Sequence, residues 1–294
     1  MSATSSYVRQ SFIARAAYRR VLDRLARDVD GRHVTGVAGV MALVLAETLA
    51  GASIFLWLSS LWNQVKPGFF KLLGAILTVL ALLTWLSVDA AVVTRFDDAG
   101  ILRASTIGAA VATAIWTILL FARQRAAARI FGLVSVAAWV SVLVWLGGAG
   151  RQSLPVALFQ LAAGAALLGA TTDGLLLGHW YLTDRKLPRA PIERVTTILL
   201  ASVVIAAVAV VSAGFSGVES STPINPLLTA GALAPWIALG MVLATALIAG
   251  LVKVVLRGER ASAVQSATGF YYLAVVTAFT AEVAVKTRFL APVG

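Results

Sequence analysis

Cysteine is absent from this sequence of 294 residues, and histidine occurs only as His33 and His179. Without cysteine the chain forms no disulfide, thiolate zinc site or iron–sulfur cluster. Two isolated histidines do not supply one copy of the chain with the paired axial ligands of a bis-histidine haem. We therefore expect no metal or cofactor to be bound by this chain alone, which leaves a quinone or a lipid as the expected small ligands.

Charged residues are also scarce. They make up 13% of the chain and hydrophobic residues 60%, whereas an ordinary soluble domain carries roughly a quarter charged residues. The apolar runs reach the about 20 residues that a helix needs to cross a bilayer. They lack the alternating pattern of an outer-membrane barrel. The sequence predicts an all-α fold, a polytopic transmembrane helical bundle.

The apolar runs predict about eight spans within one transmembrane domain, residues 34–294. No linker, soluble domain or convincing internal repeat is visible, and Pro235 predicts a kink in the seventh span. The expected spans are 34–62, 69–94, 104–122, 130–148, 154–183, 195–218, 227–252 and 265–285.

Residues 1–33 form a basic N-terminal segment that is too charged to be the core of a signal peptide. Its apolar residues recur at helical spacing, while Arg19, Arg20, Arg24 and Arg27 cover the other side. This pattern predicts an amphipathic helix that lies on the membrane surface or against a partner subunit.

The formal net charge of +11 does not indicate nucleic-acid binding, because no soluble domain is present to carry the binding face. With eight spans, the basic loops after the first, third, fifth and seventh spans share one side of the membrane. The positive-inside rule places that side in the cytoplasm, although the arginine-rich tail then lies outside. In the longest of these loops, Arg185, Lys186 and Arg189 are expected to contact an anionic lipid or a partner.

Four acidic residues lie inside the expected spans: Glu47, Asp89, Asp173 and Glu282. A charged side chain costs roughly 2.5–3.5 kcal/mol at the centre of a span, so each needs a partner, a hydrated cavity or a function. We interpret them as proton-handling or ligand-binding candidates. The alternatives are a packing hydrogen bond for Glu47, an ion pair of Glu282 with Lys286 four residues later, and contact of Asp89 with water or Arg95.

Small residues accompany two of these acids. Gly51 lies one turn after Glu47, and Gly174 and Gly178 form a small-xxx-small pair just after Asp173. Such residues let helix backbones approach closely. We expect another helix to pack tightly at both positions.

The end of the fifth span concentrates polar and aromatic residues: Thr172, His179, Trp180 and Tyr181. Imidazole titrates near neutral pH and, beside hydroxyl and indole groups, is able to bind a quinone carbonyl and supply a proton. We interpret these residues as a quinone or small-molecule site. The alternative is an interfacial aromatic belt with a solvated histidine.

The sequence contains no phosphate-binding glycine loop, nucleophile elbow, metalloprotease helix or paired aspartate motif. We therefore expect a non-catalytic membrane subunit rather than a stand-alone enzyme, in the bacterial inner membrane. The favoured function is a subunit of a larger respiratory or redox complex that handles protons or a quinone. Two alternatives remain open, a proton- or cation-coupled secondary transporter and a structural anchor for partner subunits. The oligomeric state also remains open.

Overall fold

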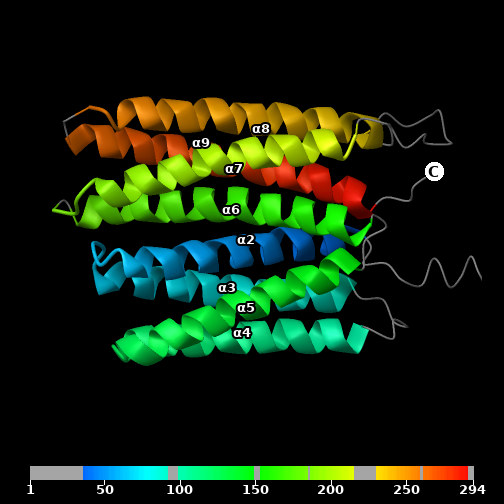
Figure 1. Cartoon of the computed structure of the whole chain (residues 1–294), viewed down its shortest axis with the longest axis horizontal. Coiled ribbons are helices and arrows are strands. Elements are labelled where there is room, and N and C mark those ends of the chain that lie inside the picture. Colours follow the sequence, from blue (N-terminus) through cyan, green and yellow to red (C-terminus); the bar gives the residue numbers. More distant parts are fainter. Residues whose placement is uncertain are drawn as a thin grey trace, which may run out of the picture.

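The computed structural model is a bundle of antiparallel helices (Figure 1) that describes residues 36–91, 99–148, 153–184, 186–214, 230–258 and 261–290. Within these residues there is no strand, and eight helices are long and apolar enough to cross a membrane. This confirms the predicted all-α bundle. The helices are α2 (Gly36–Leu61), α3 (Pro67–Ala91), α4 (Ala99–Phe121), α5 (Arg125–Gly148), α6 (Leu154–Thr183), α7 (Ala190–Ser212), α8 (Ala230–Val255) and α9 (Ala261–Leu290). The predicted amphipathic helix in residues 1–33 lies outside the described residues.

Several helices extend beyond the apolar runs that predicted them. Helix α5 begins at Arg125 rather than near residue 130, and α9 runs from Ala261 to Leu290 rather than from 265 to 285. Hydropathy marks only the part of a helix that lies in hydrocarbon, whereas backbone hydrogen bonding continues into the polar ends. Helix α8 is one continuous element through Pro235, the expected kink site.

The outer surface of the bundle is apolar. Ile118, Val204, Leu247 and Val276 are 64–67% exposed and lie on different helices. A soluble protein rarely exposes so much contiguous apolar surface, and lipid tails solvate it without cost. The surface therefore agrees with eight spans in identifying an integral membrane protein.

The eight helices form two four-helix units with the same connectivity. In α2–α5 and in α6–α9, each helix packs on the next, and the first packs on the last. The units meet mainly through α2 and α6. Two smaller contacts between them, α2 with α9 and α6 with α5, are also equivalent, and a third, still smaller contact joins α3 to α6. The main contacts thus have approximate two-fold symmetry about an axis along the helices, a repeat that was not detected in the sequence.

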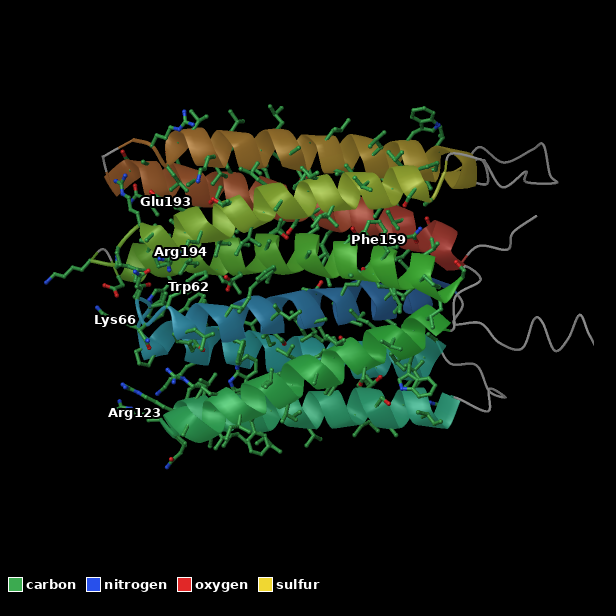
Figure 2. All side chains as sticks on the ribbon, in the orientation of Figure 1. Trp62, Lys66, Arg123, Phe159, Glu193 and Arg194 are labelled. Atoms are coloured by element: carbon green, nitrogen blue, oxygen red, sulfur yellow. The ribbon has the colours of Figure 1, made fainter. Side chains whose placement is uncertain are left out.

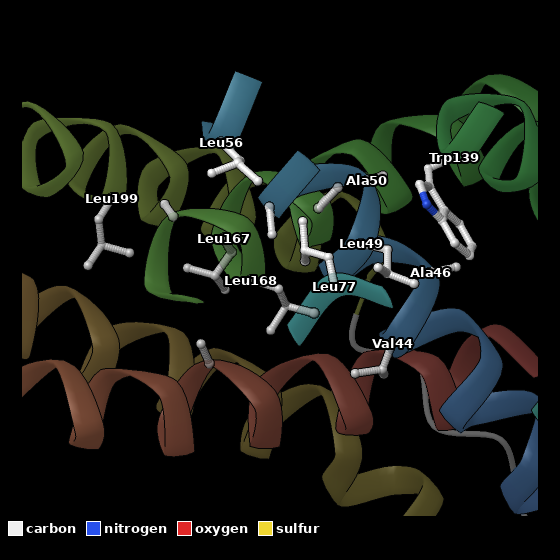
Figure 3. Packing of buried hydrophobic residues seen from close by; sticks show 14 of the residues in the cluster. Val44, Ala46, Leu49, Ala50, Leu56, Leu77, Trp139, Leu167, Leu168 and Leu199 are labelled. Atoms are coloured by element: carbon white, nitrogen blue, oxygen red, sulfur yellow. The ribbon is translucent and has the colours of Figure 1, made fainter. Parts of the chain in front are cut away.

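Helices α2 and α6 form the centre of the bundle. They are 83% and 61% buried along their apolar windows, against 28–44% for the other helices. At their crossing, a Cβ on Gly51 would lie 1.8 Å from the carbonyl oxygen of Ala165, and a Cβ on Gly169 would lie 2.4 Å from the carbonyl carbon of Gly51. Figure 3 shows Leu49 and Leu167 among the packed side chains at this centre. The predicted close approach at Gly51 is confirmed.

The turns after α2, α4, α6 and α8 lie at one end of the bundle, which we call the basic end. Figure 2 shows Lys66, Arg123 and Arg194 there, at the left of the view. The structure therefore confirms that the four basic loops share one side.

Candidate functional site

Three ionisable side chains meet inside the bundle. The Lys286 ammonium nitrogen lies 2.6 Å from Oε1 of Glu47 and 3.2 Å from Oε2 of Glu282. Glu47 and Lys286 are fully buried, and Glu282 is 3% exposed. We call these residues the Glu47–Lys286–Glu282 triad.

The triad depends on contacts among α2, α6 and α9. Glu282 and Lys286 are one turn apart and share a face of α9, and α9 packs against both central helices. Gly164 of α6 leaves the room they need, because a Cβ there would lie 2.5 Å from Oε1 of Glu47 and 2.8 Å from Oε2 of Glu282. A larger residue at position 164 would occupy the space of the carboxylates.

The surroundings of the triad contain polar atoms without hydrogen-bond partners. Within the described part of the chain this holds for Oε2 of Glu47 and for Nε2 of Gln160, both of which are buried. Gln160 lies one turn before Gly164 on the same face of α6. Buried polar groups are almost always hydrogen-bonded in proteins, so such atoms call for an explanation such as water or an ion.

Asp173 is a separate buried acid. It is fully buried, and neither of its carboxylate oxygens has a hydrogen-bond partner among the described residues. It follows Gly164 by nine residues in α6, which is about 14 Å along a helix. Asp173 therefore lies closer to the basic end than the triad does.

The helix that packs beside Asp173 is α9. A Cβ on Gly174 would lie 2.1 Å from the ring of Tyr271, and one on Gly178 would lie 2.6 Å from the hydroxyl of Thr268. Tyr271 is fully buried, and its hydroxyl lies 2.9 Å from that of Thr196 on α7. These contacts confirm the close approach expected from the glycine pair.

The four residues of the expected quinone site diverge around the end of α6. The Nδ1 atom of exposed His179 lies 3.1 Å from the hydroxyl of Tyr272, whereas Trp180 packs on Gly68 of α3. The Tyr181 hydroxyl donates a hydrogen bond to the carbonyl of Pro188. Thr172 is half-buried. Consecutive residues point about 100° apart around a helix, so nearness in sequence does not bring their side chains together.

Asp89 lies at the surface, away from the other acids. It pairs with Arg103 of α4 at 3.0 Å and is 56% exposed. Arg95, its expected partner, lies outside the described residues. This position gives Asp89 solvent and a cation, which accounts for its charge without a buried function.

The longest basic loop is held by contacts within the chain. The Lys66 ammonium lies 2.8 Å from Asp184, and its hydrogen bond is the main reason that the pKa of Asp184 is lower than usual. Arg189 donates to the carbonyl of Gly258, which joins the turns after α6 and α8. Lys186 is exposed. Arg185 lies outside the described residues, as do the tail residues Arg19, Arg20, Arg24 and Arg27.

Two residues of this region were not recognised from the sequence. Lys286 stood out only as the partner of Glu282 near the membrane edge, and Gly164 did not stand out. One signal was available, because a lysine and two acids in apolar spans need one another. The sequence separation of Lys286 from Glu47 hid that pairing.

Among the described residues, no group of three or more His, Asp or Glu side chains is placed to hold a metal ion. No family model, no curated protein and no solved structure matches this chain.

Proposed function

We propose that this integral membrane protein handles protons through the Glu47–Lys286–Glu282 triad. The observation that carries the proposal is one buried ammonium in contact with two buried carboxylates. Two carboxylates and one ammonium leave one negative charge in excess, and a net charge is costly inside a bundle. The group becomes neutral when one carboxyl holds a proton, so the triad is suited to bind and release one.

The first setting for this chemistry is a membrane subunit of a larger respiratory or redox complex in the bacterial inner membrane. The basic N-terminal pattern suits docking to a partner, and the redox cofactors would belong to other subunits. A quinone would bind near His179 and Tyr272, which are both exposed at the lipid-facing surface. There the imidazole ring of His179 lies beside the hydroxyl of Tyr272 on α9, and these are the two groups that a quinone carbonyl would contact.

The second setting is a proton- or cation-coupled carrier. The repeated connectivity of α2–α5 and α6–α9 favours it, because many transporters consist of two repeats with their coupling groups at the interface. Glu47 lies on α2, which contacts the second unit, and its partners Glu282 and Lys286 lie on α9 of that unit. The triad thus spans the two repeats.

The test is proton flux into liposomes that contain the purified chain and a trapped pH-sensitive dye. Under an imposed membrane potential, the carrier setting predicts that the wild type changes the internal pH and that Glu47→Gln abolishes the change. Asp184→Asn is the matched control, since it removes an acid that lies outside the spans. Wild-type flux in both Glu47→Gln and Glu282→Gln would refute the role of the triad.

The two settings predict different outcomes. Flux by the isolated chain supports the carrier. Flux that appears only in native membranes, together with stoichiometric copurification of redox subunits, supports the complex. If the triad variants change neither the proton flux nor the copurification of other subunits, and removal of residues 1–33 releases a partner, the protein is a structural anchor.

A further inference from the structure

A pocket of about 990 Å³ opens at the basic end of the first four-helix unit. Residues of α2, α3, α4 and α5 and of the turns after α2 and α4 line it, together with Trp180 of α6. Its volume is at the upper end of the range for small-molecule sites, about 300–1,000 Å³. It is separate from the triad, whose residues do not line it.

The lining of the pocket is strongly cationic. Lys71, Arg123, Arg125 and Arg129 line it, and no acidic residue does so among those that the structure describes. Lys66 also lines it but is paired with Asp184. The other four form no ion pair with any described carboxylate, so the charge of the three arginines is available to an anion. The Lys71 ammonium lies over the Phe121 ring, 5.3 Å from its centroid, and adds to the positive charge of the lining.

Three tryptophans form the apolar wall. The indoles of Trp57 and Trp116 pack on Gly132, where a Cβ would lie 2.9 and 2.8 Å from them, and Trp180 packs on Gly68, where a Cβ would lie 2.6 Å away. The Trp57 indole nitrogen donates to the carbonyl of Arg129 at 3.0 Å. The Trp180 indole nitrogen is buried and has no hydrogen-bond acceptor among the described residues. The wall is therefore fixed in place and keeps one donor available.

Arg123 lies at a position that usually holds glycine. It has φ +59°, and the end of α4 forms a Schellman motif, in which the amide of Gln124 donates to Leu119 and that of Arg123 to Leu120. The residue with left-handed backbone in this motif is usually glycine, because a Cβ is disfavoured there. Arg123 therefore lines the pocket although its left-handed backbone conformation is one that residues with a Cβ disfavour.

Apolar surface that faces lipid continues from the pocket. Leu72 and Val79 of α3, Ile118 of α4 and Ile130 of α5 are 41–64% exposed. A ligand held by its charged group at the pocket would have hydrocarbon surface beside it, at the level where helix ends meet lipid headgroups. Cytoplasmic leaflets also carry anionic lipids, and the positive-inside rule places this end there.

We propose that this pocket binds the phosphate headgroup of an anionic phospholipid, with the acyl chains against the exposed faces of α3, α4 and α5. Arginine forks suit phosphate oxygens, and the Trp180 indole N–H suits a phosphate or ester oxygen. Zwitterionic lipids carry an ammonium that the four cations repel. The site therefore selects headgroups with a net negative charge.

The test is lipid binding by the delipidated full-length protein in detergent, measured by native mass spectrometry and by thermal unfolding. Phosphatidylglycerol is expected to bind and raise the unfolding temperature, and phosphatidylcholine is not. The Arg123→Gly, Arg125→Ala double variant should bind phosphatidylglycerol at least about tenfold more weakly. Arg257→Ala removes an exposed charge at the same end, outside the pocket lining, and should bind as the wild type does.

Arg123→Gly alone should unfold at or above the wild-type temperature, because glycine relieves the left-handed residue. Loss of binding in this variant would then not reflect misfolding. Equal binding of both lipids, or equal binding by all variants, would overturn the proposal. If inorganic phosphate or glycerol phosphate at millimolar concentration protects as well as phosphatidylglycerol and competes with it, the site binds a soluble phosphate instead of a lipid.

Discussion

Two ion-pair clusters of this protein have similar contact distances and opposite surroundings. Lys286 contacts Glu47 and Glu282 at 2.6 and 3.2 Å with all three side chains buried. Lys66 contacts Asp184 at 2.8 Å at the basic end, where the side chain of Lys66 is 63% exposed and that of Asp184 is 9% exposed. The first cluster has lost the hydration of all its charges, whereas the ammonium of the second pair keeps much of its hydration.

Contact distance therefore does not measure what an ion pair contributes. A buried charge depends on its partner, because an unpaired one is expensive where water is absent. An exposed charge that loses its partner returns to water at little cost. Changes in the triad should be severe and changes in the Lys66–Asp184 pair mild.

The largest effect is expected from Lys286→Met, which leaves both buried acids without their cation. Breaking a buried pair typically costs about 3–5 kcal/mol, so we expect a large fall in the unfolding temperature of the protein in detergent, followed by tryptophan fluorescence. The matched control is the triple variant that adds Glu47→Gln and Glu282→Gln. It carries no buried charge in the triad and should recover much of the loss. Wild-type stability of Lys286→Met would show that the triad does not hold the helices together.

An intermediate effect is expected from Gly164→Ala, which changes no charge. Its methyl group would lie 2.5 Å from Oε1 of Glu47, so the carboxylates must move away from their positions around Lys286. Overpacking of this kind costs typically about 1–3 kcal/mol. Gly240→Ala in α8 is the control, since nothing lies within 4 Å of the added Cβ. The idea fails if the two variants unfold at the same temperature.

The smallest effect is expected at the basic end and depends on pH. Because the pKa of Asp184 is lowered in the folded protein, mainly by the Lys66 hydrogen bond, the pair stabilises the fold above the ordinary carboxyl range. This contribution is lost as the pH falls through the lowered pKa. Wild type and Asp184→Asn should differ slightly in unfolding temperature at pH 7 and converge in acid. A difference that grows as the pH falls would contradict this assignment.

The number of spans could be read from the sequence because crossing a bilayer requires long apolar runs and internally satisfied backbones. The ends of the helices could not be read in the same way. Helix α5, for example, begins at Arg125, before the apolar run that predicted it. The repeat was also hidden. Only a short stretch recurs at equivalent places, LAGAS at 49–53 and LLGAT at 167–171, because many apolar sequences are able to fill the same position in a bundle.

The candidate site was partly predictable. Glu47, Asp173 and Glu282 stood out because carboxyl groups are costly in an apolar span, and the structure buries all three. Asp89 stood out for the same reason but pairs with Arg103 at the surface. Sequence position within a span does not show which face a residue occupies or how near water lies.

The sequence by itself determined that this chain crosses the membrane as helices and that its four basic loops share one end, since both follow from local composition and from counting spans. Only the tertiary structure decided that Lys286 meets Glu47, that Gly164 makes room for them, and that tryptophans and arginines enclose a pocket. The physical reason is that these contacts join side chains far apart in the chain. The packing of the helix faces sets which of these side chains meet.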